Sequence, residues 1–351
     1  MRTGIDLRAL AAKIEANREL KHDLVVDTAV ARMEIDGDRK PLLRIADDHS
    51  YPIQPIAHRQ ISTHTNIPAT YYDRMMEDAP ALLADNVNTW LHLNPSRRMV
   101  RTLGGDMRAF LSDRYQRIEH EEIAEVVLPV LSDESGIKIV SAEATDRKLY
   151  LHAVTSRIQR EVRKGDVVEA GVLIQNSEVG HGSVSIQALV WRLVCLNGMK
   201  MPDGAYRRNH VGRRVEDDET IEQVWADDTR RADDRAVLLK VRDTVRAALD
   251  EARFALRIAK LTELATDAKI TGDPVKAIEV LAKKVNIAEG ERGGILRSLI
   301  EGNGLTAWDM INAVTAQAHT ADYDRAVEFE SIGGRMAEMP ATEWKAILQA
   351  A

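Results

Sequence analysis

Basic side chains are concentrated in one short stretch, residues 192–214, together with two aromatic residues in or beside it. Its cations are Arg192, Lys200, Arg207, Arg208, Arg213 and Arg214, and its one acidic residue is Asp203. Trp191 precedes the stretch and Tyr206 lies within it. Phosphate binding needs cations spaced along a groove, and binding of unpaired bases needs exposed aromatic rings. The stretch therefore has the residue types that bind a single strand of nucleic acid.

Two further groups of cations lie outside this stretch. Arg157, Arg160, Arg163 and Lys164 fall in a predicted hairpin loop, and Arg97, Arg98 and Arg101 fall at the start of a predicted strand. Aromatic residues make up only 4% of the chain, so we do not expect a long stacking platform. In an alternative interpretation, the arginines of residues 192–214 pair with the acidic segment that follows and dock a helical domain.

The charge distribution indicates a local basic surface on an acidic chain. The formal net charge of −7, taken alone, argues against a polyanionic partner. Residues 151–215, however, hold 10 Lys and Arg against 5 Asp and Glu, whereas residues 216–235 hold nine acidic residues and three arginines. Local charge sets the electrostatic footprint of a binding site. The basic segment is therefore the expected binding region.

Catalytic and cofactor motifs are absent from the sequence. Gly290–Gly294 is not followed by Gly-Lys-Ser/Thr and so is not a P-loop, and neither a G-x-S-x-G elbow nor an H-E-x-x-H metal motif occurs. The single cysteine, Cys195, has no context that marks a nucleophile. We therefore expect no cofactor, no ATP-driven activity, and a binding protein rather than an enzyme.

Acidic residues leave one catalytic alternative open. A metal-dependent nuclease needs carboxylates that converge from several elements. Asp106, Asp113, Glu143 and Glu178 fall in or beside the predicted sheet and are the candidates for such a site. Residues 119–122 (EHEE) open a predicted helix, where acidic side chains interact favourably with the helix dipole, so we interpret them as helix N-terminal residues.

Periodicity and turn residues predict an α+β fold. We expect helices over residues 5–22, 54–65, 70–79 and 80–92, and a hairpin over residues 29–45. From residue 98 the order is ββαββββ, a central and mostly antiparallel sheet with one packed helix. After residue 215 the chain is predicted to be all helical, beginning with a long helix in which Val237, Val241 and Val245 share one face.

These changes of character divide the chain into three regions. Residues 1–97 form an N-terminal helical and hairpin region, and residues 98–215 form the α+β core, the candidate nucleic-acid-binding unit. Residues 216–351 form a helical C-terminal domain, entered through the acidic segment.

Residues 54–79 are similar to a helix–turn–helix unit. Its second helix would be ATYYDRMMED, which carries the single cation Arg74 among three acidic residues. Because a helix that enters a DNA groove faces phosphates, this charge favours a packing role over duplex reading.

The compartment is expected to be the cytoplasm. No run of about 18 apolar residues occurs, and the amphipathic N-terminus lacks the apolar core of a signal peptide. One cysteine fits a reducing compartment. We expect no membrane partner.

Four ordered motifs resemble those of the phage and plasmid-like proteins grouped as domain-of-unknown-function family 932. They are Leu111–Tyr115 (LSDRY), Asn176–Gly180 (NSEVG), Arg192–Met199 (RLVCLNGM) and Thr306–Thr315 (TAWDMINAVT). Val179 stands where the family motif has a small polar residue. The resemblance covers about residues 98–335 and implies an origin in prophages, plasmids or other mobile elements. The core is similar in outline to the annealing proteins of phage recombination, which bind single strands without ATP and form rings or filaments.

The motif residues Arg114, Tyr115, Asn176, Ser177, Gly180, Asn197 and Gly198 are expected to be structural. Asparagine at a strand end can hold a turn through its side chain, and glycine supplies positive φ. If the two strands are neighbours, Asn176 and Asn197 would meet at one edge of the sheet, beside the basic loop. That edge is the predicted binding site.

The leading hypothesis is an ATP-independent single-stranded DNA-binding and annealing protein of a phage or mobile element, acting in homologous recombination. It would assemble as a homo-oligomer, a ring or a filament, and could work with a partner exonuclease or a host single-strand-binding protein. Two alternatives stay open: a metal-dependent nuclease, and a non-enzymatic interaction or regulatory protein of the element.

Overall fold

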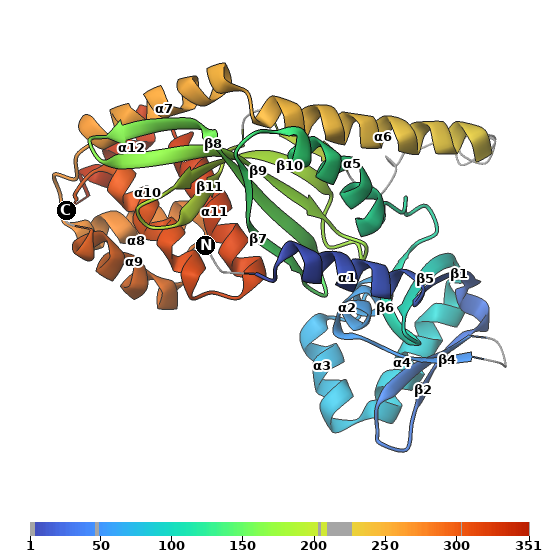
Figure 1. The fold of residues 1–351 in the computed structure, drawn as a ribbon. Helices are drawn as coiled ribbons and strands as arrows, with labels where there is room; N and C mark the ends of the chain where they lie inside the picture. The colour runs from blue at the N-terminus through green and yellow to red at the C-terminus, as the bar shows by residue number, and fades with distance from the viewer. Residues whose placement is uncertain (1–3, 46–48, 203–204, 209–226, 303, 351) are drawn as a thin grey trace.

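The computed structural model describes residues 4–45, 49–202, 205–208, 227–302 and 304–350. Its first part is built from two small antiparallel sheets and a group of helices (Figure 1). The elements are α1 (Leu7–Arg18), β1 (Lys21–Asp27), a 3-10 turn (Thr28–Val30), β2 (Ala31–Ile35), β3 (Pro41–Ile45), β4 (His49–Pro52), α2 (Pro55–His64), α3 (Ala69–Asp78), α4 (Pro80–Leu93), β5 (Arg97–Leu103) and β6 (Asp106–Ser112). The sheet orders are β1-β5-β6 and β2-β3-β4.

Proline sets where two of these helices begin. Pro55 and Pro80 occupy the first turns of α2 and α4, where a missing N–H costs no hydrogen bond. Between α2 and α3, Asn66 takes a left-handed conformation with φ 54° just before Ile67 and Pro68. Tyr72 and Met75 of α3 are buried, which is the packing role expected for this helix.

The centre of the molecule is a curled antiparallel sheet. It comprises β7 (Ile137–Ala144), β8 (Leu149–Arg163), β9 (Asp166–Asn176), β10 (Val184–Arg192) and β11 (Asn197–Lys200) in the order β11-β10-β9-β8-β7, and β12 (Tyr206–Arg208) also pairs with β10. Helix α5 (His120–Asp133) packs on it. Nearly every residue of β9 is buried, so this strand is covered on both faces.

From residue 227 onward, the described residues are mainly helical, and their helices cover the sheet. They are α6 (Asp227–Ala248), α7 (Glu251–Thr266), α8 (Pro274–Val285), α9 (Glu289–Glu301), α10 (Ala307–Ala316), a 3-10 turn (Gln317–His319), α11 (Tyr323–Ala337) and α12 (Ala341–Leu348). Figure 1 shows α6 beside α5 on one side of the sheet and α8 to α11 on the other. Asp250, Asp273 and Asp322 cap helices by accepting hydrogen bonds from backbone N–H groups.

The predicted α+β class, with its antiparallel sheet and helical C-terminal region, is confirmed. Several details differ from expectation. The first two strands of the ββαββββ order, β5 and β6, pair with β1 in a separate sheet. Residues 21–27 form β1, although the first helix was expected to extend to residue 22 and no strand was expected before residue 29. The pairing of β1 with β5 crosses the predicted boundary at residue 97. Local periodicity could not reveal a partner that lies so far along the chain.

Strand β8 is longer than its pattern indicates. Arg157, Arg160 and Arg163 belong to this strand, where β-bulges interrupt the pairing with β9, and Lys164 alone lies in the turn. The expected hairpin loop is therefore much shorter. The acidic segment lies partly outside the described residues, and α6 begins at Asp227. Within the described ranges, no helix is long and apolar enough to cross a membrane.

Candidate anion-binding site

Two arginines of the predicted basic surface are used inside the fold. Arg192 pairs with the buried Asp166 through Nε (2.5 Å) and Nη2 (2.9 Å), and Trp308 of α10 donates its Nε1–H to the same carboxylate at 2.9 Å. Arg163 pairs with Asp309 of α10 at 2.8 Å. These contacts dock the C-terminal helices on the sheet, so neither guanidinium is free for a phosphate.

Other predicted cations have carboxylate partners on the surface. Arg157 pairs with Glu134, Arg160 with Glu251 of α7, and Arg208 with Asp233 of α6. The Arg208–Asp233 pair is the kind of contact expected if the arginines of residues 192–214 dock a helical domain through the acidic segment. Lys164 is exposed in its turn. Arg213 and Arg214 lie outside the described residues.

The predicted aromatic residues do not form an open platform. Trp191 is only 6% exposed and packs with Val154 and Leu189. Tyr206 of β12 is half-buried. Of the strand-start arginines, Arg98 lies over the ring of Phe110 and Arg101 is buried. Because the Trp191 ring is buried, it offers no open face on which a base could stack.

Asn176 and Asn197 lie at opposite ends of the sheet, so the single edge predicted for them is wrong. Strand β10 pairs with Gln175 of β9 through Ser185, at its start, and with Asn197 of β11 through Arg192, at its end. Because β10 lies between the two neighbouring strands, its whole length separates the asparagines. The basic segment is divided in the same way, since Arg207 pairs with Ser185 in the strand register.

Both asparagines connect separate elements and do not hold their own turns. Asn176 Nδ2 donates to the carbonyl of Ile118 at 2.8 Å, just before α5, and Asn197 Nδ2 donates to Thr315 Oγ1 of α10 at 2.6 Å. The Tyr115 hydroxyl donates to the Ser177 carbonyl at 2.8 Å. The four sequence motifs thus meet in pairs, LSDRY with NSEVG and RLVCLNGM with TAWDMINAVT. Arg114 of the first motif is exposed.

The two motif glycines have different roles. Gly180 has φ +74°, as expected, and a Cβ there would meet Leu111 Cδ2 at 2.6 Å. Gly198 does not have positive φ. It lies in β11 opposite Trp191, where a Cβ would meet Leu189 Cδ1 at 2.9 Å, and the left-handed residue of the preceding turn is Leu196, with φ 48°. Close packing, not turn geometry, therefore favours glycine at 198.

A cavity of about 800 Å³ lies between the sheet and α11, at the Asn176 end of β9. Three carboxylates, those of Asp322, Asp324 and Glu328, line it, together with His181. The cations that line it outnumber these carboxylates and are Arg147, Lys148, Lys200, Arg207, Arg325 and Arg335. Only Lys200 and Arg207 were among the predicted binding residues. The others come from the turn before β8 and from α11, and no local signal distinguishes them from ordinary surface cations.

Pairing divides the cations of the cavity into two classes. Arg325 is held by Glu291 and Glu328, each at 2.6 Å, and Arg147 lies 3.9 Å from Asp324. For Lys148, Lys200, Arg207 and Arg335, no carboxylate of the described part of the chain lies within 4.0 Å. Arg207 Nε instead donates to Ser183 Oγ at 3.0 Å, and Lys200 Nζ to Gln175 Oε1 at 3.3 Å. Among the described residues, these four cations can accept an anion without breaking an ion pair.

The two lysines have little to compensate their burial. Burial lowers the pKa of Lys200 to about 8, and Glu330 offsets only part of that effect. Burial also lowers the pKa of Lys148, with Arg207 and Arg147 acting in the same direction and Asp324 against it. A bound anion would stabilise both ammonium groups. The cavity is therefore suited to phosphate or carboxylate groups.

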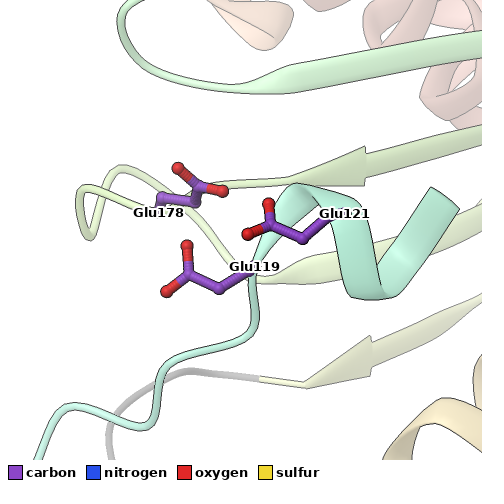
Figure 2. A group of neighbouring side chains, drawn as sticks. All are labelled: Glu119, Glu121 and Glu178. Carbon is purple, nitrogen blue, oxygen red and sulfur yellow. The ribbon is translucent and has the colours of Figure 1, made fainter. Parts of the chain in front are cut away.

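A carboxylate cluster lies elsewhere, between the N-terminal sheet and the core. Figure 2 shows Glu119 and Glu121 at the start of α5 and Glu178 in the loop after β9. One carboxylate oxygen of each lies within 4.8 Å of those of the other two. Of the carboxylates predicted from sequence, only Glu178 belongs to it. Those that lie elsewhere are Asp106, which accepts a hydrogen bond from Gln54, the exposed Asp113, and Glu143, which lies near Lys13.

Cationic side chains already neutralise this cluster. Lys21 Nζ lies 2.7 Å from Glu121, 2.7 Å from Glu178 and 3.1 Å from Glu119. Burial alone would raise the pKa of Glu178, but His120, Arg108 and Lys21 hold it well below its usual range. The lysine ammonium thus occupies the position that a divalent cation would need.

Comparison with known proteins gives one match. A family model described as a domain of unknown function (DUF932) matches residues 109–337, well over half of the chain. The matched range includes all four motifs, from Leu111–Tyr115 to Thr306–Thr315, and it contains the whole curled sheet and α11. No curated protein and no solved structure matches the chain.

Proposed function

Because this chain belongs to the DUF932 family, whose function is unknown, we propose its function from the cavity: ATP-independent binding and annealing of single-stranded DNA. The observation that carries the proposal is the set of four cations, Lys148, Lys200, Arg207 and Arg335, that line one cavity without carboxylate partners in the described residues. Phosphodiester groups are the anions that such a set would bind in series.

The cavity supports sequence-independent binding. Contacts to phosphates position a strand but carry no base information. An annealing protein needs this property, because it must bind either complementary strand and leave the base edges free for pairing. In this proposal the protein acts as a homo-oligomer in recombination of a phage or mobile element.

The direct test is binding of a labelled oligo-dT to the purified protein between 50 and 200 mM salt. Four neutralised phosphates at a single-strand slope of roughly −0.7 each predict about a fiftyfold loss of affinity over this range. The variant Lys148→Ala/Arg207→Ala/Arg335→Ala should bind weakly and lose about three quarters of the salt slope. Its matched control is Arg157→Ala/Arg160→Ala, which removes two arginines paired outside the cavity and should bind like the wild type.

The outcome separates the functional classes. Steep, metal-independent binding followed by faster pairing of complementary labelled strands, with an oligomer seen by light scattering, supports annealing. Binding without faster pairing limits the function to strand protection. A wild type that does not bind at 50 mM salt removes the proposal and favours an interaction or regulatory protein.

A further inference from the structure

A second pocket, of about 520 Å³, lies in the N-terminal part of the molecule. It is formed by the end of α2, the turn that follows, the first turn of α3 and one face of α4, and Figure 1 shows these helices together below the curled sheet. Asn86, Trp90 and Asn94 are spaced four residues apart and therefore line the same side of α4 and its end.

Two aromatic rings in this pocket are exposed. Tyr71 is 44% and Trp90 is 43% exposed, in contrast to the buried Trp191. Trp90 Nε1 donates to Asn86 Oδ1 at 3.0 Å, which holds the indole in place along α4. A large aromatic side chain at a protein surface that is fixed by a hydrogen bond offers a stable stacking face.

The rest of the lining is neutral and polar. None of the residues that line the pocket is Asp, Glu, Lys or Arg, and burial lowers the pKa of His64 to about 4, so this ring is neutral at pH 7. The exposed amides of Asn66 and Asn94 have no side-chain hydrogen-bond partner within the described part of the chain. A carboxamide presents a donor and an acceptor in one plane, as the edge of a nucleobase does.

We infer that this pocket is a nucleobase-binding subsite, in which a base stacks on Trp90, beside Tyr71, and the amides of Asn66 and Asn94 hydrogen-bond to its edge. An uncharged ligand that is flat and rich in hydrogen-bonding groups fits a neutral pocket with aromatic walls better than a phosphate or a charged peptide does. The inference rests on the proposed function, because the base would belong to a strand whose phosphates occupy the cationic cavity.

The two sites are joined through one loop. Residues 177–183 follow β9, and His181, Gly182 and Ser183 of this loop line the cationic cavity. The Val179 carbonyl accepts a hydrogen bond from Gln60 Nε2 of α2 at 2.8 Å. Gln60 lies one helical turn before His64, which lines the aromatic pocket. The same loop therefore contacts both the cavity and the helix that ends at the pocket.

The test compares oligo-dT with an abasic strand that has the same number of phosphates. The wild type should bind oligo-dT about tenfold more tightly, since stacking of one base is worth on the order of a tenfold change in affinity. Trp90→Ala should abolish this preference and leave the salt slope unchanged, and Asn94→Ala should reduce it. Leu82→Ala removes an exposed side chain of α4 outside the pocket and should retain the preference.

The failures of the two proposals are distinguishable. Salt-dependent binding with equal affinity for both strands, or a preference that survives in Trp90→Ala, overturns the base subsite and leaves the DNA-binding function standing. If the wild type binds neither strand, the indole N–H resonance of Trp90 is followed during titration with thymidine. A shift that Tyr71→Ala weakens supports the pocket by itself. If thymidine causes no shift of the Trp90 resonance, the base subsite is overturned. A shift caused by N-acetyltyrosinamide but not by thymidine also overturns it and assigns the pocket to a peptide.

Discussion

The role of a cation in this protein depends on its partner. Arg192 and Arg163 have buried carboxylates within 3 Å, Asp166 and Asp309, and serve the fold. Lys148 and Lys200 have no such carboxylate in the described residues, and their burial disfavours the charged form. A ligand anion restores the missing Coulomb attraction. Unpaired and partly buried cations are therefore better indicators of a binding site here than cation density along the sequence.

Lys200 predicts how DNA affinity depends on pH. Its pKa, lowered by burial to about 8, leaves the ammonium mostly charged at pH 7 and mostly neutral at pH 9. A bound phosphate favours the charged form, so affinity should fall as pH rises through 8, by up to tenfold per pH unit for one linked proton. In Lys200→Met, the decrease in DNA affinity around pH 8 should disappear. The other charged groups that face this position, Lys148, Arg207, Arg335 and Glu330, remain in the variant. Fluorescence anisotropy at fixed ionic strength measures both proteins. Parallel pH profiles would contradict the assignment.

The elements are held together by the residues that the motifs contain. The end of β9 places Asn176 against Ile118, just before α5, and the loop that follows places Ser177 against Tyr115. The start of β9 places Asp166 between Arg192 of β10 and Trp308 of α10. One strand thus organises both ends of the sheet. This gives the sequence motifs a physical basis in docking of elements, independent of any ligand.

Asp166→Ala should destabilise the protein more than the loss of any surface ion pair. It leaves the Arg192 guanidinium buried without its carboxylate and Trp308 without its acceptor, a change that costs about 3–5 kcal/mol. Arg160→Ala, which breaks the exposed pair with Glu251, should cost no more than about 1 kcal/mol. Urea denaturation followed by circular dichroism compares the two. Equal midpoints would show that the Asp166 contacts do not hold the helices on the sheet.

A charge network connects the N-terminal sheet to the core of the molecule. Lys21 of β1 and Arg101 of β5 enter it from one side, and Glu119, Glu121 and Glu178 enter it from the other. Arg101 Nη1 also donates to the Glu178 carbonyl at 2.8 Å. Because the network is buried, it fixes the position of the N-terminal unit only while its charges balance.

Lys21→Met should leave the carboxylates of Glu119, Glu121 and Glu178 without the ammonium group that pairs with all three. Removing the ammonium should lower stability by about 3 kcal/mol. Mn²⁺ should then raise the thermal midpoint of the variant, because three carboxylates within 4.8 Å can bind a divalent cation once the lysine is gone. Lys13→Met, which removes an exposed lysine near Glu143, is the control and should show neither effect. An equal rise of the wild-type midpoint with Mn²⁺ would return the metal-dependent nuclease to consideration.

Most helices and strands could be predicted from the sequence alone, because their signals act over a few residues. Pro55, Pro80 and the Asp273-Pro274 pair mark helix starts within their own turns, and alternating apolar residues identify β9 and β10. The α+β class and the four family motifs follow from the same kind of local pattern. The missed β1 shows the limit, since its identity as a strand depends on β5, which pairs with it from the other end of the N-terminal unit.

The candidate sites depend on contacts that only the tertiary structure decides. The sequence analysis predicted a binding surface on residues 157–164 and 192–214. In the fold, however, Arg192 pairs with Asp166 of β9, Arg163 with α10, Arg160 with α7 and Arg208 with α6. The fold gathers Lys148 and Arg335, from distant segments, beside Lys200 and Arg207. A charged side chain has the same appearance in a sequence whether or not a carboxylate lies beside it. Whether one does is set by the packing of elements far apart in the chain, and that pairing decides which cations remain available for a ligand.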